Sequence, residues 1–94
     1  MTYRESYLVV CETSKEMMYT FRYLVEYMKQ LNMKFKASLG SMSISIFYGE
    51  IYMKFCTYER MCTAVRGRRD FKIIYGRTIN MALDSYKNNE RNQK

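Results

Sequence analysis

The sequence predicts a small α/β protein in which one sheet carries a long amphipathic helix after its first strand, a central β-hairpin and a C-terminal helix. A continuous apolar run at Tyr7–Cys11 is typical of a strand buried on both faces. After this run, apolar residues recur at the spacing of a helix. Further along the chain they alternate with polar residues, which is typical of strands. The 94 residues suit one domain with a modest core. We expect residues 1–86 to form it and residues 87–94, which are all polar, to be a frayed tail.

The long helix is predicted by apolar residues that recur at steps of three and four. They are Met17, Phe21, Leu24, Met28 and Leu31. Thr13 and Glu16 have the spacing of a capping box at the start of this helix. Asn32 is the expected C-terminal stop, so the helix covers about 18 residues.

The middle of the chain alternates between apolar and polar residues. Residues 33–39 alternate first, and Gly40 ends that segment. Residues 43–55 then predict an antiparallel hairpin that turns at Tyr48–Glu50. A short helix from about residue 58 to residue 65, capped by Thr57, is expected next.

Two elements are predicted near the C-terminus. Phe71–Tyr75 is interpreted as another buried strand. Thr78 is the expected cap of a last helix with Ile79, Leu83 and Tyr86 on its apolar side. This order of elements favours a sheet with parallel strands, joined by right-handed crossovers and extended by the hairpin.

Composition excludes several classes of protein. The chain has no histidine, so the usual general base, Ser/His or Cys/His pairs and most zinc sites are missing. Its 3 cysteines cannot form a closed disulfide framework, and Cys56 and Cys62 lack metal-ligand spacing. No signal peptide and no apolar run of membrane-spanning length is recognised. We therefore expect a cytoplasmic domain with no metal, no cofactor and no membrane partner.

Positive charge is concentrated in one segment. The formal net charge is +7, and residues 60–76 contribute +4 of it, from five basic residues and Asp70. The basic residues are Arg60, Arg66, Arg68, Arg69 and Lys72. Clustered cations attract nucleic acids through counterion release, and they attract acidic protein surfaces by the same Coulomb force. A solvated loop that keeps the protein soluble is the simpler interpretation.

The order of motifs between Tyr7 and Tyr75 resembles the middle of a P-loop ATPase core of the phage terminase or helicase kind. The matching parts are the strand at Leu8–Cys11, the hairpin at Ser43–Phe55 and the Arg66-Gly67-Arg68 segment. The sequence lacks the Gly-rich Lys-Ser/Thr loop that cradles phosphates, and it has Tyr75-Gly76 where the family's last strand ends in acidic residues. The resemblance therefore implies a remnant that binds no nucleotide, and convergence on a common topology is the alternative.

A metal-dependent nuclease is the one enzymatic alternative. Asp70 and Lys72 match half of such a site, and Glu50 or Glu59 would have to supply the second carboxylate. The simpler interpretation is that Asp70 pairs with the neighbouring arginines. We therefore expect a protein that binds rather than catalyses.

The 10 tyrosines interleave with basic residues. Bases stack on aromatic faces while cations contact phosphates, which favours single-stranded DNA or RNA as the partner. Ordinary half-buried tyrosines explain most of the ten. The predicted binding residues are Tyr52, Lys54, Tyr58, Arg60, Arg66, Arg68, Arg69 and Lys72.

Docking on another protein is the alternative function. Tyr, Arg and Met are enriched in protein interfaces. A small phage or mobile-element protein that inhibits a host factor, for example a CRISPR or other defence nuclease, fits this composition. A homodimer through an exposed edge of the hairpin is also consistent with the pattern, because an unpaired strand edge invites pairing.

Overall fold

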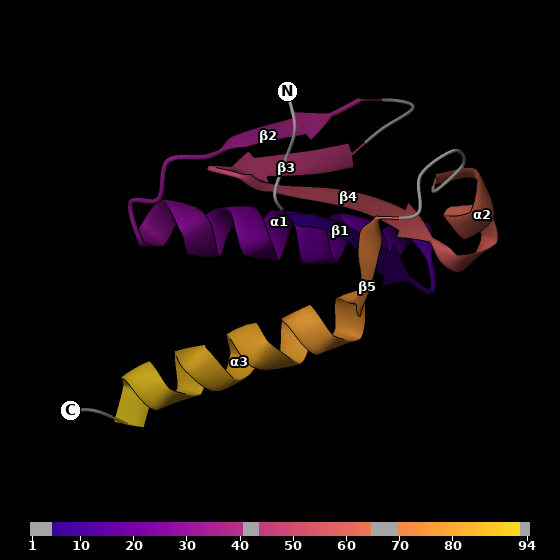
Figure 1. Cartoon of the computed structure of the whole chain (residues 1–94). Helices are drawn as coiled ribbons and strands as arrows, with labels where there is room; N and C mark the ends of the chain where they lie inside the picture. The colour runs from indigo at the N-terminus through magenta and orange to yellow at the C-terminus, as the bar shows by residue number, and fades with distance from the viewer. Residues whose placement is uncertain (1–4, 41–43, 65–69, 93–94) are drawn as a thin grey trace.

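Five strands form one mixed sheet, and two long helices lie on the same face of it (Figure 1). The computed structural model describes residues 5–40, 44–64 and 70–92. The elements are β1 (Glu5–Cys11), α1 (Ser14–Gln30), β2 (Lys36–Leu39), β3 (Ile44–Tyr48), β4 (Ile51–Thr57), the 3-10 turn η1 (Tyr58–Arg60), α2 (Met61–Ala64), β5 (Phe71–Tyr75) and α3 (Gly76–Asn92). The predicted α/β fold class is confirmed.

The strands lie in the order β2-β3-β4-β1-β5. β1 pairs in parallel with β4 and with β5, whereas β3 pairs antiparallel with β2 and with β4. The predicted hairpin and the parallel strands are therefore confirmed. The predicted open edge on the hairpin is wrong, because Lys36–Leu39 forms a strand that pairs with β3. The outer strands are β2 and β5, so the hairpin offers no edge for a homodimer.

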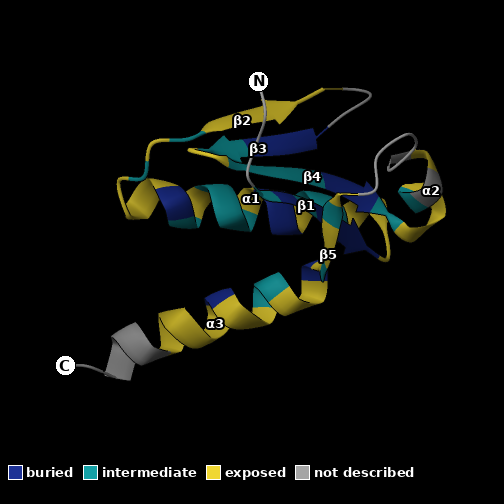
Figure 2. Ribbon diagram, in the orientation of Figure 1, coloured by how far each residue is buried: buried dark blue, intermediate teal, exposed yellow. Residues whose placement is uncertain are grey.

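The core lies around β1. Leu8, Val9, Val10 and Cys11 are each at most 1% exposed, which confirms a strand buried on both faces. Val9 and Cys11 belong to the cluster under α1, where Phe21 meets Phe55 edge to face at 5.5 Å between ring centroids. Leu8 and Val10 pack with Cys56, Met61 and Phe71 on the opposite side. Figure 2 shows the buried centre of the sheet and the exposed β2 and α3.

Both ends of α1 are set by local hydrogen bonds. Thr13 caps the N-terminus, because its Oγ1 accepts from the backbone N–H of Glu16 at 3.0 Å. Asn32 adopts a left-handed conformation at φ 55°, and its N–H donates to the carbonyl of Lys29. The N–H of Met33 donates to the carbonyl of Met28, which completes a Schellman motif. The predicted cap and stop are confirmed.

The C-terminal third differs from the prediction in three respects. β5 was predicted to be buried, but it is an edge strand with Ile73 47% exposed. An apolar run alone does not distinguish a central strand from an edge strand. α3 begins at Gly76, directly after β5, so Thr78 lies in its first turn instead of capping it. The helix continues to Asn92, so residues 87–92, expected to fray, are helical.

α3 is joined to the rest of the protein mainly near its start. The amide nitrogen of Asn80 donates to Oγ1 of the buried Thr20 at 3.0 Å, and Leu83 is buried. Most described residues beyond Leu83 are exposed (Figure 2). α3 therefore packs beside α1 but contributes few buried side chains to the core.

Candidate nucleic-acid interface

The face of the sheet opposite α1 and α3 is defined by the alternation of side chains along each strand. Val9 on β1 and Phe55 on β4 point to α1, so Leu8 and Lys54 point to the other face. Within the described part of the chain, only the short η1–α2 segment packs on that other face, through Met61. We call it the open face.

Three aromatic side chains lie in a row across the open face. Phe47 on β3 is directly opposite Tyr52 on β4, and their rings stack at 4.9 Å between centroids and 26° between planes. Tyr52 also meets Phe71 on β5 at 6.1 Å, across the small buried Ser6 of β1. We call Phe47, Tyr52 and Phe71 the aromatic row. Its rings are partly exposed, which places aromatic surface at the boundary with solvent.

Two lysines flank the aromatic row on the same face. Lys36 of β2 is paired with Phe47 and is exposed. Lys54 follows Tyr52 by two residues on β4 and is paired with Ser45 and Leu8. Two of the predicted binding residues, Tyr52 and Lys54, are thus brought together.

A second group of aromatic side chains lies toward the carboxyl ends of the parallel strands. Tyr58, at the start of η1, contacts Tyr75 with ring centroids 5.9 Å apart, and the guanidinium of Arg77 lies 5.6 Å from the Tyr75 ring. Tyr58 and Tyr75 are both exposed. Partial burial, with Tyr75 nearby, raises the pKa of Tyr58, so its phenol is neutral at physiological pH. Because Tyr75 follows Phe71 by four residues, this group lies about 13 Å along the strand from the aromatic row.

Arg60 lies at this second end of the sheet as well. It is exposed, and with Lys54 it lines a cavity of about 650 Å³ between the N-terminus of α1 and the end of β4. Thr13, Ser14 and Glu59 line the same cavity. Lys54 and Arg60 therefore line one cavity, together with Met17 and Phe55 from the α1 side of the sheet.

Lys72 lies on the other face of the sheet. Its ammonium is 3.7 Å from Oε1 of Glu5 and 5.7 Å from the centre of the Tyr7 ring. A hydrogen bond from the Tyr7 hydroxyl, followed by the charge of Lys72, lowers the pKa of Glu5. Side chains alternate along β5, so Phe71 lies on the open face and Lys72 on the opposite face of the sheet. Lys72 is therefore not on the same face as Tyr52 and Lys54.

The other predicted phosphate contacts, Arg66, Arg68 and Arg69, lie outside the described residues. In sequence they immediately precede Asp70 and Phe71.

The nuclease alternative stays a prediction. Asp70 is exposed just before β5, and Lys72 is engaged with Glu5. Among the described residues, no three cysteine or acidic side chains lie close enough to hold a metal ion.

Sequence reasoning missed Phe47, Phe71 and Lys36. The sequence shows each of them as an aromatic or basic residue in a segment expected to form a strand. Whether these side chains lie side by side, however, depends on the order of the strands in the sheet. Only the β1–β5 pairing brings Phe71, 19 residues after Tyr52 in the sequence, beside that ring.

Comparison with protein-family models, with curated proteins and with solved structures found no match to this chain. The resemblance to P-loop ATPase cores therefore stays a prediction. None of the helices in the described ranges is both long and apolar enough to cross a membrane.

Proposed function

We propose that this protein binds single-stranded nucleic acid across the open face of its sheet. The observation that carries the proposal is the aromatic row, which joins three different strands and is flanked by Lys36 and Lys54. Stacking platforms combined with cations are the means by which proteins hold unpaired bases and their phosphates.

The chemistry of this face favours single strands over duplexes. Bases in a duplex are stacked on each other and expose only their edges, so aromatic side chains gain little from them. An unpaired strand can place its bases against Phe47, Tyr52 and Phe71 and its phosphates near the lysines. The Arg66–Arg69 segment, which precedes Phe71 in the sequence, adds charge for further phosphates.

The span of the row sets the size of the contact. The ring centroids of Phe47 and Phe71 lie 4.9 Å and 6.1 Å from that of Tyr52, so the three rings span at most about 11 Å. This length suits a short run of nucleotides. The Tyr58–Tyr75 pair, about 13 Å away along β5, extends the same track for a longer oligonucleotide.

The test is fluorescence anisotropy with labelled 15-mers of dT and rU and a 15-base-pair duplex, at several salt concentrations. We expect micromolar binding of the single strands at low salt and weaker binding of the duplex. Loss of one stacked base is worth about 1–3 kcal/mol, so Tyr52→Ala lowers affinity about 5- to 150-fold. Tyr52→Phe, which keeps the ring, binds as the wild type does.

Charge variants give a second readout. Each lost phosphate contact lowers the slope of log affinity against log salt by about 0.7 for a single strand. Lys54→Ala therefore lowers it by about 0.7, and replacing Arg66, Arg68 and Arg69 together lowers it by about 2. Lys72→Ala, on the opposite face, is the matched control. Absence of binding at low salt, or equal effects of Lys54→Ala and Lys72→Ala, contradicts the proposal.

A further inference from the structure

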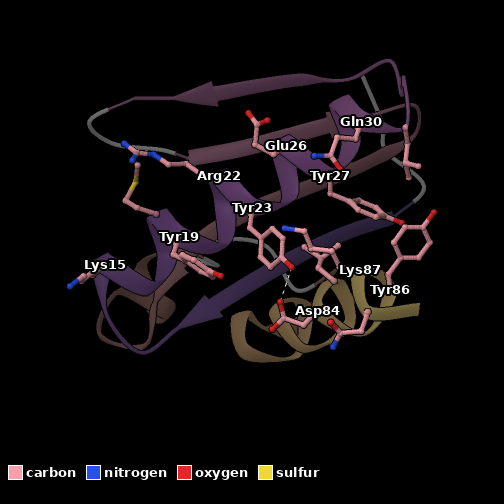
Figure 3. A pocket seen from close by; sticks show the side chains of 14 residues that line it. Lys15, Tyr19, Arg22, Tyr23, Glu26, Tyr27, Gln30, Asp84, Tyr86 and Lys87 are labelled. Atoms are coloured by element: carbon pink, nitrogen blue, oxygen red, sulfur yellow. Dashed lines mark hydrogen bonds between the residues drawn. The ribbon is translucent and has the colours of Figure 1, made fainter. Parts of the chain in front are cut away.

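A groove of about 1130 Å³ lies between α1 and α3, on the side of the protein opposite the aromatic row. Figure 3 shows side chains from both helices meeting across it. Figure 1 shows the axis of α3 diverging from that of α1 towards the C-terminus of α3. Met18, Tyr27 and Leu83 contribute apolar surface to its lining.

Tyrosines form one wall of the groove. Tyr19, Tyr23 and Tyr27 follow each other at four-residue steps on α1, so they share one face of the helix. The Tyr19 and Tyr23 rings meet edge to face at 5.6 Å between centroids, and Tyr27 meets Tyr86 of α3 at 5.2 Å. Tyr19 is 56% exposed. These rings present a broad contact surface that loses little conformational entropy on binding.

The two helices are joined across the groove by an exposed polar contact. The hydroxyl of Tyr23 donates to the carboxylate of Asp84 at 2.7 Å, and this bond raises the pKa of Tyr23 to about 12. The ammonium of Lys87 lies 5.7 Å from the centre of the Tyr23 ring. These contacts hold the two walls of the groove against each other.

Cations outnumber anions along the groove: Lys15, Arg22 and Lys87 face Glu26 and Asp84. Both carboxylates are already engaged, since Glu26 lies 3.8 Å from the ammonium of Lys29 and Asp84 accepts from Tyr23. Lys15 and Arg22 form no ion pair with any described residue. The charged side chains that line the groove therefore leave a small excess of positive charge, +1, around a tyrosine-rich surface.

We propose that this groove docks an acidic amphipathic helix of a partner protein. Its volume lies slightly above the usual range for small-molecule sites, about 300–1,000 Å³, and leaves room for a peptide segment. Its walls are two helices of 17 residues, each about 25 Å long, and a third helix packs naturally between such ridges. Apolar residues of the partner cover the tyrosines while its carboxylates face Lys15, Arg22 and Lys87.

The groove is distinct from the open face that we propose for nucleic acid. The aromatic row and Lys54 lie on the far side of the sheet from α1. One molecule can therefore hold both partners, and the two proposals fail or succeed separately.

The test is a display selection on the immobilised full-length chain. The library consists of 20-residue helical peptides whose positions vary among Leu, Phe, Glu, Lys and Gln. We expect enriched peptides to be acidic, with apolar residues at i, i+3 or i+4, and i+7. Their synthetic, labelled copies should bind at least tenfold less well to the Arg22→Glu/Lys87→Glu variant, measured by anisotropy. Both residues are exposed, so this variant should fold, and its circular dichroism spectrum checks that it does.

Controls separate the groove from general electrostatics. Lys54→Glu, on the open face, should leave peptide binding unchanged, and Tyr19→Ala should weaken it without any change of charge. Five outcomes overturn the proposal, four of them in the peptide experiments. These four are no enrichment, enrichment of basic or neutral peptides, equal binding to the groove variant, and displacement of the peptide by dT15. Self-association through the groove, seen by sedimentation of the wild type but not of Arg22→Glu/Lys87→Glu, assigns it to a second copy and also overturns the proposal.

Discussion

Substitution of Gly76 by alanine tests how tightly α3 is joined to the sheet. Gly76 begins α3 immediately after β5 and is buried. A Cβ at this position would lie less than 3.0 Å from Sγ of Cys11, and 3.3 Å from both Glu16 Oε1 and Thr20 Oγ1. Cys11 and Thr20 are at most 1% exposed, so neither can move aside easily. The added methyl group therefore overpacks the junction of β1, α1 and α3.

The expected effect is a moderate loss of stability. Overpacking of a well-packed site costs about 1–3 kcal/mol, and the lower backbone entropy of alanine offsets about 0.5–1 kcal/mol of it. The net loss is about 1–2 kcal/mol, which lowers the Tm of a domain of this size by about 5–15 °C. Calorimetry or thermal circular dichroism measures this shift.

A double-mutant cycle identifies the cause. Cys11→Ala removes the sulfur that the new methyl group meets, so the double variant should recover about 1 kcal/mol relative to the sum of the single effects. Additive effects, or a Gly76→Ala protein as stable as the wild type, would refute the close packing inferred at this junction.

Three further predictions concern local interactions. Burial raises the pKa of the Cys11 thiol to about 11 from its ordinary 9.0, so the free energy of unfolding should fall by about 2 kcal/mol as pH rises from 9 to 11. Urea titrations of the wild type and of Cys11→Ala check this, and a wild-type dependence no steeper than the variant's contradicts it. Thr13→Ala removes the cap bond to Glu16 and should lower the free energy of unfolding by about 1 kcal/mol, whereas Thr13→Ser should not. Tyr23→Phe removes the bond to Asp84 and should speed amide exchange in α3 but not in β1; uniform acceleration counts against a local tie.

The parts of the fold that local sequence determines were predicted well. The apolar repeat gave α1, and the Thr13 cap and the Asn32 stop are both formed because their hydrogen bonds involve only neighbouring residues. The hairpin was predicted for a similar reason. Its two strands pair directly across Gly49, which adopts a positive φ of 58°.

The errors arose where burial depends on neighbours distant in the sequence. β5 was predicted to be buried from its apolar run, but it has only one partner strand. The same limitation applies to the candidate site. Tyr52 and Lys54 were correctly predicted to share a face, whereas Lys72 was grouped with them although the register of β5 places it behind the sheet. Phe47 and Phe71 were not recognised, because the aromatic row exists only once β3, β4, β1 and β5 are in order.

Titration of ¹⁵N-labelled protein with dT15 in heteronuclear NMR spectra tests nucleic-acid binding at the open face most directly. The proposal predicts that the largest shifts map to the amides around Phe47, Tyr52 and Phe71 and to those of Lys36 and Lys54. Amides in the middle of α1 and in the C-terminal half of α3 should stay unchanged. No shifts at low salt, or shifts that centre on the groove between α1 and α3, would contradict it.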